Sequence, residues 1–230
     1  FTHPDYVYAV VNTGDEKLII AEQLLDQVME DAGFEEDEYE IERTLSGSDL
    51  RGLKYETPFI DEIQKQQELD EEDGVHRVHN SENLVTLEEG TGLVHAATGH
   101  GPEDYEETRP LGLPVFSPLD TEGYYTEEAG ELKGKNVLEV DPELVEMLDE
   151  KGLLLNSELY RHEYPHCWRC KTELIYRAAD QWFIRNEEVK QRMLEENEEV
   201  DWIPESTRKR FHNFVSESPD WCISRQNYCG

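Results

Sequence analysis

The sequence GTGLVHAATGHGPEDY, residues 90–105, combines four glycines with two histidines and two acids. Its apolar part, Leu93–Ala97, has the length of a short strand, and the glycines around it suit a backbone that another group approaches closely. Pro102 is favourable at the first position of a helix. Glu103 and Asp104 then fall in the first helical turn, where the helix dipole favours carboxylates. The pattern predicts a strand, a glycine loop and a helix start that bring two histidines and two acids to one loop.

This glycine loop differs from the loops that bind phosphate. The G-x-x-x-x-G-K-[ST] spacing is absent and no lysine is near, while the two acids would repel a phosphate group. An acidic pocket suits a cationic group, such as an ammonium, instead. Glycine-rich turns between a strand and a helix are also common without any function, so a purely structural loop is the alternative.

The same stretch resembles the GTGxVHxAPGHGxxDY segment in the editing domain of isoleucyl-tRNA synthetases, with Thr98 where that family usually has proline. Ser46–Phe59 is similar to the GxxLxGLxYxxPF segment of the same domains, and Ser117–Gly123 is similar to their PVDxxG segment. Residues 162–183 are similar to HxYPHCWRCKTxLIYRAxxQWF, the segment that follows the editing insertion. These motifs occur in the family's order and cover nearly the whole chain.

The end of the chain, DWCISRQNYCG, is similar to the DWCISRQRYWG return into the catalytic domain of this family, with Asn227 and Cys229 in place of the usual Arg and Trp. Because the chain starts at Phe1 without methionine and stops at Gly230, we interpret it as a piece of a longer protein. The family's threonine-rich editing peptide is then expected just upstream. The HIGH and KMSKS signatures do not occur, so ATP and Mg²⁺ are expected to bind the parent enzyme outside this stretch.

Short apolar runs separated by turn residues predict a β-rich α+β fold with a few helices. The expected strands are residues 6–11, 38–45, 75–78, 84–87, 113–116, 137–140 and 153–160. The expected helices are residues 15–33, 141–152 (with Asp141 as the cap), 186–196 and 205–216. The charge run 61–73 has no apolar face and is predicted to be an exposed loop without a function.

The resemblance implies a more specific architecture. It implies that residues 1–160 are an editing domain that lacks its threonine-rich part. The fold implied for this domain is a small closed β-barrel decorated with helices. A connective segment with a zinc knuckle and helices, residues 161–215, is expected to follow. Residues 216–230 are expected to begin the return into a Rossmann-type catalytic domain.

The resemblance also implies a reaction. It implies that this stretch carries post-transfer editing, the hydrolysis of valine mis-attached to tRNA(Ile), while the parent enzyme attaches isoleucine to tRNA. It places Asp104 at the ammonium of the misacylated valine and His95 near the ribose or the ester. The other groups expected to bind substrate are Gly92, His100 and Gly101. Two alternatives remain open: an editing domain of the valyl or leucyl type, and a noncatalytic acidic module for tRNA binding or assembly.

Metal ligands are expected at the C-x-x-C pair, Cys167 and Cys170, whose thiolates can share one Zn²⁺ ion. A structural zinc site needs four ligands, and the candidates for completing it within this chain are His162, His166, Cys222 and Cys229. The resemblance favours a second C-x-x-C upstream, and two reduced cysteines in a turn are the alternative. His76 and His79 would lie on opposite faces of an expected strand, so no metal site is expected there.

Acidic residues dominate the composition. The chain has 54 Asp and Glu against 21 Lys and Arg, a formal net charge of −33 over 230 residues. This charge opposes nonspecific attraction to nucleic acid or to an anionic membrane. The sequence is 10% aromatic and keeps regular apolar stripes, so we expect the acids to coat a folded surface, as in proteins adapted to high salt. The expected contact for RNA phosphates is the basic cluster of Arg208, Lys209, Arg210 and His212, for which a solvated helix face is the alternative.

The compartment expected from the sequence is the cytoplasm. The sequence contains no secretory signal and no apolar run of transmembrane length, and its cysteines include the C-x-x-C pair of an expected metal site. The expected partners are therefore tRNA(Ile) mischarged with valine and the rest of the synthetase chain, without a membrane.

The acidic surface predicts a stability that depends on salt. Because screening shortens the range of charge repulsion, the melting temperature should rise between about 0.1 M and about 2 M KCl. Thermal unfolding followed by circular dichroism at several KCl concentrations measures this directly. A melting temperature that stays level or falls over that range would contradict the high-salt interpretation.

Overall fold

The computed structural model describes residues 1–159, 161 and 163–224, and it divides into two compact units, residues 1–178 and 179–230. His162, Asn227 and Cys229, which the sequence singles out, lie outside the described residues. The domain boundaries expected after residues 160 and 215 stay predictions. Among the described residues, none of the helices combines the length and the apolar character that a membrane crossing needs.

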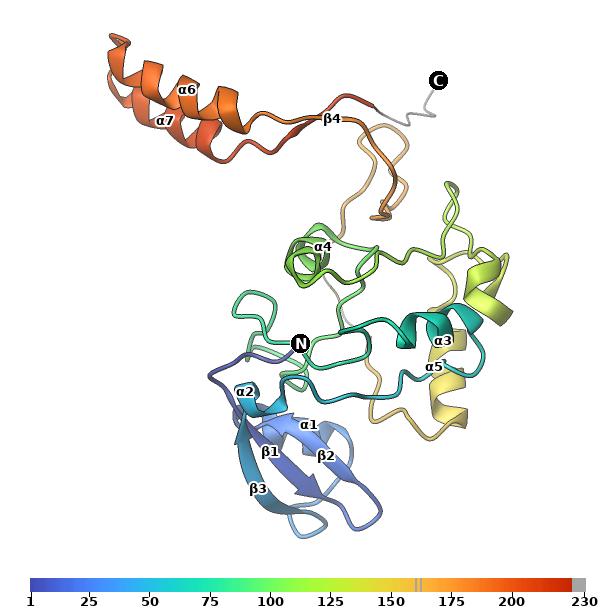
Figure 1. The fold of residues 1–230 in the computed structure, drawn as a ribbon. Helices are drawn as coiled ribbons and strands as arrows, with labels where there is room; N and C mark the ends of the chain where they lie inside the picture. The colour runs from blue at the N-terminus through green and yellow to red at the C-terminus, as the bar shows by residue number, and fades with distance from the viewer. Residues whose placement is uncertain (160, 162, 225–230) are drawn as a thin grey trace. The chain divides into compact units, whose positions relative to one another are not determined.

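The first unit begins with a three-stranded antiparallel sheet (Figure 1), in the order β2-β1-β3. Its strands are β1 (Val7–Asn12), β2 (Lys17–Ala21) and β3 (Glu40–Ser46). The strands expected at residues 6–11 and 38–45 are therefore confirmed. A tight turn closes the first hairpin, in which the Thr13 amide donates to the Glu16 carbonyl at 3.0 Å.

The helix expected over residues 15–33 is wrong in its first part. Residues 17–21 form β2, paired with β1 from Tyr8↔Ala21 to Asn12↔Lys17, and the helical structure begins only at η1 (Glu22–Leu24) and α1 (Leu25–Asp31). The segment Leu18–Ala21 is apolar throughout, so it fits the residue period of a strand as well as that of a helix. The adjacent edge of β1 supplies its backbone hydrogen-bond partners. Pairing across the turn therefore decides between strand and helix.

The sheet has one core cluster on each face, because successive side chains of a strand point to opposite sides. On one face Ala9, Val11 and Ile20 pack with Leu25 and Met29 of α1. On the other face the buried residues are Tyr8, Ala21 and Leu50, and the partly buried residues packed against them include Val78, Leu87 and Leu93. The second cluster joins the sheet to the segment that carries the glycine loop.

The closed barrel expected for the first unit is wrong for the part of the chain that the structure describes. Beyond the sheet, the segments 75–78, 84–87, 113–116, 137–140 and 153–159 form no strands. The pairing outside named strands in this part is limited to isolated bridges, such as Lys54↔Arg77 and Tyr124↔Asn136. Four of these five segments are only four residues long, and Pro110, Pro114 and Pro118 interrupt the chain around one of them, which disfavours a continuous ladder. The fold is α+β with few strands.

The helices of the first unit beyond the sheet are short. They are α2 (Gly47–Leu50), α3 (Gln64–Asp70), α4 (Pro102–Thr108), η2 (Arg109–Leu111), η3 (Glu127–Leu132) and α5 (Asp141–Glu150). The helix starts expected at Pro102 and near Asp141 are confirmed, although Val140 is the N-cap of α5 and Asp141 is its first residue. The loop expected at residues 61–73 is wrong, because this segment contains α3.

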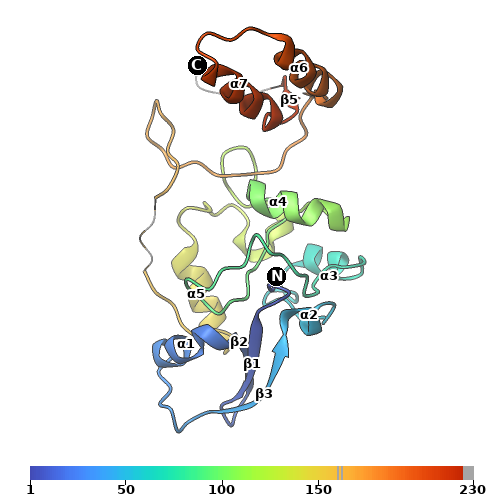
Figure 2. The ribbon, with the colours of Figure 1, turned by 90° about the vertical axis from the view of Figure 1, so that its left-hand side faces the viewer.

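The second unit is built on a helical hairpin. Helices α6 (Glu187–Glu199) and α7 (Ser206–Ser216) lie side by side in Figure 1 and in Figure 2, as the helical periodicity of these segments predicts. A two-stranded pair, β4 (Phe183–Ile184) and β5 (Trp221–Cys222), joins its ends. Trp202 fastens the turn end, because its indole N–H donates to the Asn197 side chain at 3.0 Å and its ring lies 5.4 Å from that of Phe211.

Candidate functional site

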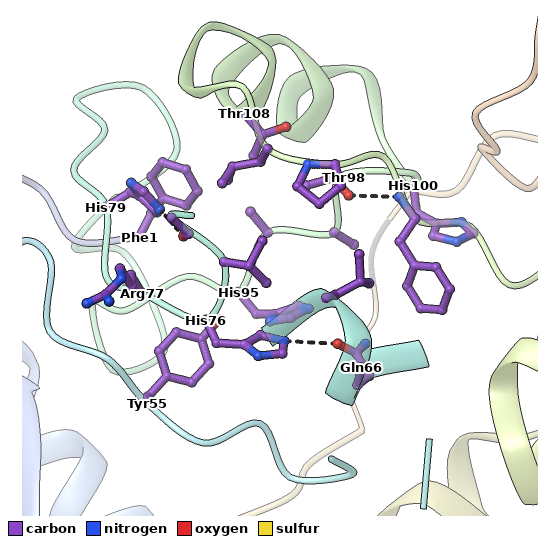
Figure 3. A pocket seen from close by; sticks show the side chains of 18 of the residues that line it. Phe1, Tyr55, Gln66, His76, Arg77, His79, His95, Thr98, His100 and Thr108 are labelled. Carbon is purple, nitrogen blue, oxygen red and sulfur yellow. Dashed lines mark hydrogen bonds between the residues drawn. The ribbon is translucent and has the colours of Figure 1, made fainter. Parts of the chain in front are cut away.

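The first unit contains a cavity of about 270 Å³ whose wall comes from segments far apart in the sequence. Figure 3 shows that the labelled side chains come from residues 55–79, from residues 94–100 of the glycine loop, and from Phe1 and Thr108. Four histidines line it: His76, His79, His95 and His100. A partly enclosed site of this size, with a mostly apolar wall and a few polar side chains, fits a small group that is partly apolar.

Gly92 attaches the glycine loop to the sheet. Its carbonyl accepts the buried Tyr8 hydroxyl at 2.8 Å, and the Ala21 amide donates to the Thr91 carbonyl at 2.8 Å. A Cβ at Gly92 would lie 2.4 Å from the Ala21 Cβ, so no side chain fits at this position, whose φ is +74°. Gly92 therefore positions the loop, and it is not among the residues that line the cavity.

Thr98 and Gly99 hold the far side of the loop. The Thr98 hydroxyl accepts the Phe116 amide at 3.1 Å, a bond that the proline usual in the family cannot accept through its ring. A Cβ at Gly99 would lie 2.1 Å from the Phe116 carbonyl oxygen, and the Gly99 carbonyl accepts the Ala178 amide at 2.8 Å. The loop is thus packed backbone against backbone, which is why glycine is needed there.

Asp104 lies in the first turn of α4. The helix begins directly after Gly101, whose φ of +121° turns the chain into the helix. Its Oδ2 accepts the Ala97 amide at 2.8 Å, so the carboxylate connects the helix start to the loop. Asp104 is behind the cavity wall rather than part of its lining. Its charge still reaches the site, because it raises the pKa of His95 against the opposing effect of burial.

His95 lines the cavity and is open to it, although protein atoms surround the ring. This partial desolvation disfavours the imidazolium and lowers the pKa of His95 below its ordinary value of 6.5. The Asp104 carboxylate acts in the opposite direction, while His76 lowers the pKa further. His95 is therefore a neutral imidazole near pH 7, able to accept one hydrogen bond and donate another.

His100 lies at the other end of the loop. Its Nδ1 is 2.9 Å from the Tyr176 carbonyl oxygen, which fixes the plane of the ring and sets Nδ1 as the donor. The structure thus brings His95 and His100 to one cavity and puts Asp104 and Gly101 directly behind it, with Gly92 in the supporting contact.

His76 is a cavity residue that the sequence interpretation underrates. Its Nδ1 lies 2.8 Å from Asp70 Oδ1 and its Nε2 lies 2.9 Å from Gln66 Oε1, the contact drawn in Figure 3. Lys54 holds the same carboxylate at 2.7 Å. The expectation that His76 and His79 point to opposite sides is wrong, because both line the cavity. The sequence did contain one sign of this arrangement: Gln66 and Asp70 are four residues apart, so on a helix they share the face that can hold the His76 ring.

The C-x-x-C pair lies in a short hairpin, residues 165–174, which we call the knuckle hairpin. Antiparallel pairing of His166 with Glu173 and the Cys167 amide bonded to the Thr172 carbonyl at 2.8 Å define it. Hydrogen bonds from the Thr172 side chain first, then from its backbone and from Cys167, lower the pKa of the Cys170 thiol to about 7. No group of three or more His, Cys, Asp or Glu side chains among the described residues is placed to hold a metal ion.

The basic cluster on α7 is partly structural. The Arg208 guanidinium donates to the carbonyls that end α6, at 2.9 Å to Asn197, 2.8 Å to Glu198 and 2.9 Å to Val200. These bonds satisfy carbonyls that have no partner within their own helix. Lys209, Arg210 and His212 remain exposed.

A sequence model of the family described as tRNA synthetases class I (I, L, M and V) matches residues 13–230. The chain belongs to this family. It is 47% identical to the isoleucine–tRNA ligase of Pyrococcus furiosus, 45% to that of Methanopyrus kandleri and 46% to that of Archaeoglobus fulgidus. Each comparison covers 99% of this chain and 21% or 22% of the relative, so the chain spans about a fifth of these class I synthetases.

The environment of His95 predicts its titration. Its ring protons should titrate with a midpoint below 6.5 in NMR spectra, and Asp104→Asn should lower the midpoint further by removing the carboxylate that stabilises the imidazolium. Glu103→Gln, on the exposed side of the same turn, should leave it unchanged. Because the unfolded state binds this proton at higher pH than the folded state, the contribution of His95 to the free energy of unfolding should fall as pH drops below about 6.5. A midpoint that rises in Asp104→Asn would contradict this electrostatic arrangement.

Proposed function

We propose that this chain is the part of an isoleucine–tRNA ligase that hydrolyses valine mis-attached to tRNA(Ile). The observation that carries the proposal is the small cavity in which neutral His95 lies in front of the Asp104 carboxylate at the start of α4. The family model covers the isoleucyl, leucyl, methionyl and valyl types alike, and the names of the relatives support the isoleucyl type among them. The synthesis of isoleucyl-tRNA from ATP belongs, in this proposal, to the rest of the protein.

The need for such a site follows from the limit of hydrophobic recognition. Valine lacks one methylene of isoleucine, and a missing methylene changes binding by only about 1–3 kcal/mol, for which this amino-acid pair is the familiar example. A synthetic site alone therefore accepts valine too often, and a second site that hydrolyses the smaller product restores accuracy.

The residues of the cavity fit the hydrolysis of an aminoacyl ester. Water attacks the ester carbonyl, the bond to the ribose oxygen breaks, and that oxygen takes up a proton, which releases valine and tRNA. Asp104 attracts the α-ammonium of valine, because the charge of its carboxylate also acts on His95 in the cavity and raises the pKa of that ring against the effect of burial. Neutral His95 can accept a hydrogen bond from the attacking water or from a ribose hydroxyl.

No side chain among the described cavity residues pairs a nucleophile with a base, so the rate depends on positioning and electrostatics. His100, oriented by the Tyr176 carbonyl, completes the wall around the ester, and Gly101 turns the chain into α4 behind it. The cavity, at about 270 Å³, is close to the lower limit of about 300 Å³ for small-molecule pockets. It therefore suits an aminoacyl group and leaves the tRNA outside.

A noncatalytic module that binds tRNA is the second candidate, favoured by the burial of Asp104 Oδ2 against the Ala97 amide. In that case the carboxylate only stabilises the helix start and the loop. The two functions differ in what a neutral isostere of Asp104 does.

Asp104→Asn tests the editing function most directly. Asparagine keeps an oxygen for the Ala97 amide but loses the charge that attracts the ammonium, and a hydrogen bond to a charged group contributes about 1.5–3 kcal/mol. We expect kcat/KM for valyl-tRNA(Ile) hydrolysis by the full-length synthetase to fall about 10- to 150-fold. Glu103→Gln is the matched control and should deacylate at the parent rate. Hydrolysis that is unchanged in Asp104→Asn would show that the carboxylate only stabilises the helix start, and a parent protein that does not hydrolyse valyl-tRNA(Ile) would leave the noncatalytic module as the function.

We also propose that Cys167 and Cys170 provide half of a structural zinc site. Their sulfurs lie in one turn, and the lowered pKa of Cys170 favours the thiolate that zinc requires. The ion would crosslink the knuckle hairpin to two further cysteines upstream of this chain and would take no part in hydrolysis.

The half site predicts weak binding of zinc by the 230-residue chain and tight binding by a protein extended upstream. Competition with a chromophoric chelator measures both affinities, and Cys167→Ser should abolish tight binding in the longer protein. Stoichiometric zinc that survives the chelator in the shorter chain would show local ligands, with His166 and His162 as the candidates.

A further inference from the structure

The tip of the knuckle hairpin presents an aromatic ring to solvent. Trp168 is 78% exposed, although tryptophan is normally among the more buried residues. The Arg169 guanidinium lies 5.0 Å from the centroid of its ring, within the range of a cation–π interaction. Lys171, at the end of the same turn, is exposed and has a positive φ of 64°. The turn therefore combines an indole with two cationic groups on one projection.

The charge of this segment is the reverse of that of the chain. Residues 165–177 carry three basic residues, Arg169, Lys171 and Arg177, and one acid, Glu173, while the chain as a whole carries 21 basic and 54 acidic residues. The acid lies 4.0 Å from His166, on the paired part of the hairpin rather than at the tip. An anionic partner would therefore meet locally favourable charge at the tip and repulsion over most of the remaining surface.

The segment that leaves the hairpin leads directly to the cavity. The Tyr176 carbonyl orients His100, and the Ala178 amide donates to the Gly99 carbonyl at 2.8 Å. Tyr176 lies five positions after Lys171, and an extended chain of that length spans at most about 18 Å. A strand of nucleic acid that touches the tip can therefore continue toward the cavity.

We propose that the tip of the knuckle hairpin, Trp168–Lys171, binds single-stranded RNA by stacking a base on the Trp168 indole and pairing phosphates with Arg169 and Lys171. This inference rests on the proposed function, which makes the acceptor end of tRNA the RNA concerned. Unpaired bases are free to stack on an aromatic side chain, whereas bases of a duplex already stack on one another. The combination of aromatic and cationic groups is the usual one for single-stranded nucleic acid.

The basic cluster on α7 is a weaker candidate for the same role. Arg208 is bonded to three carbonyls of the hairpin, and the neighbouring α6 carries six glutamates against Lys190 and Arg192. Phe214 is 74% exposed there and provides a ring for comparison.

Trp168→Ala in the full-length synthetase tests the proposal, with an uncharged tRNA(Ile) transcript as the probe. Loss of one stacked base should weaken binding about 5- to 150-fold in a fluorescence anisotropy titration, while Trp168→Tyr should retain most of the affinity. The matched control is Trp182→Ala, which removes an indole that is 77% exposed in the other unit and should leave the affinity unchanged. Lys171→Gln should reduce the slope of log Kd against log salt by about 0.7, the value for one contact to single-stranded RNA.

Other outcomes would overturn the proposal. Unchanged affinity in Trp168→Ala together with a lower melting temperature would show that the indole packs against protein, and a loss confined to Phe214→Ala would move the contact to α7. Equal losses in Trp168→Ala and Trp182→Ala would also contradict it. Deacylation of valyl-tRNA(Ile) measured at saturating enzyme separates the two proposals. If the parent synthetase deacylates at the full rate but Trp168→Ala does not change tRNA binding, only this inference fails. If the parent synthetase does not deacylate but Trp168→Ala weakens tRNA binding, only the editing function fails.

Discussion

The contact on which the site depends is the one between Tyr8 and Gly92. The Tyr8 hydroxyl is buried, donates to the Gly92 carbonyl and accepts the His3 amide at 3.0 Å, so its removal would leave two backbone groups without this partner. Such an unsatisfied buried group costs about 1–3 kcal/mol. Because Gly92 lies directly on Ala21, Leu93 enters the core and the residues after it leave the sheet as the cavity wall. The sheet thus sets the position of His95.

Charges in this acidic protein act over two different ranges. The net charge of −33 acts over long distances, and salt reduces its range to about 3 Å at 1 M. Contacts such as the bond between Asp104 and the Ala97 amide, or between His76 and Asp70, are shorter or enclosed and are screened much less. Short contacts therefore fix the local arrangement around the cavity, while the surface charge contributes repulsion over longer distances.

Local patterns predicted the elements whose stability is local. The helix start at Pro102, with Asp104 in its first turn, and the helices α6 and α7 follow from capping preferences and from a period of 3.6 residues. The same patterns failed for β2 and α3. Residues 17–21 fit the apolar stripe of a helix, but pairing with β1 makes them a strand. The many charges of residues 61–73 predicted a loop, whereas α3 forms there and contributes Gln66 and Leu69 to the cavity. The barrel expected by resemblance does not form in the described residues, where the short runs between prolines pair only as isolated bridges.

The sequence by itself determined the motifs, the family to which they belong, and the close spacing of His95, His100 and Asp104 on one loop, because these depend on neighbours within about ten residues. Only the tertiary structure decided which groups face the cavity. It put Asp104 behind the wall and His76 in it, assigned Gly92 to the sheet contact, and used Arg208 to end α6. These assignments require contacts between segments that are distant in the chain, and such contacts form only when the core clusters bring those segments together.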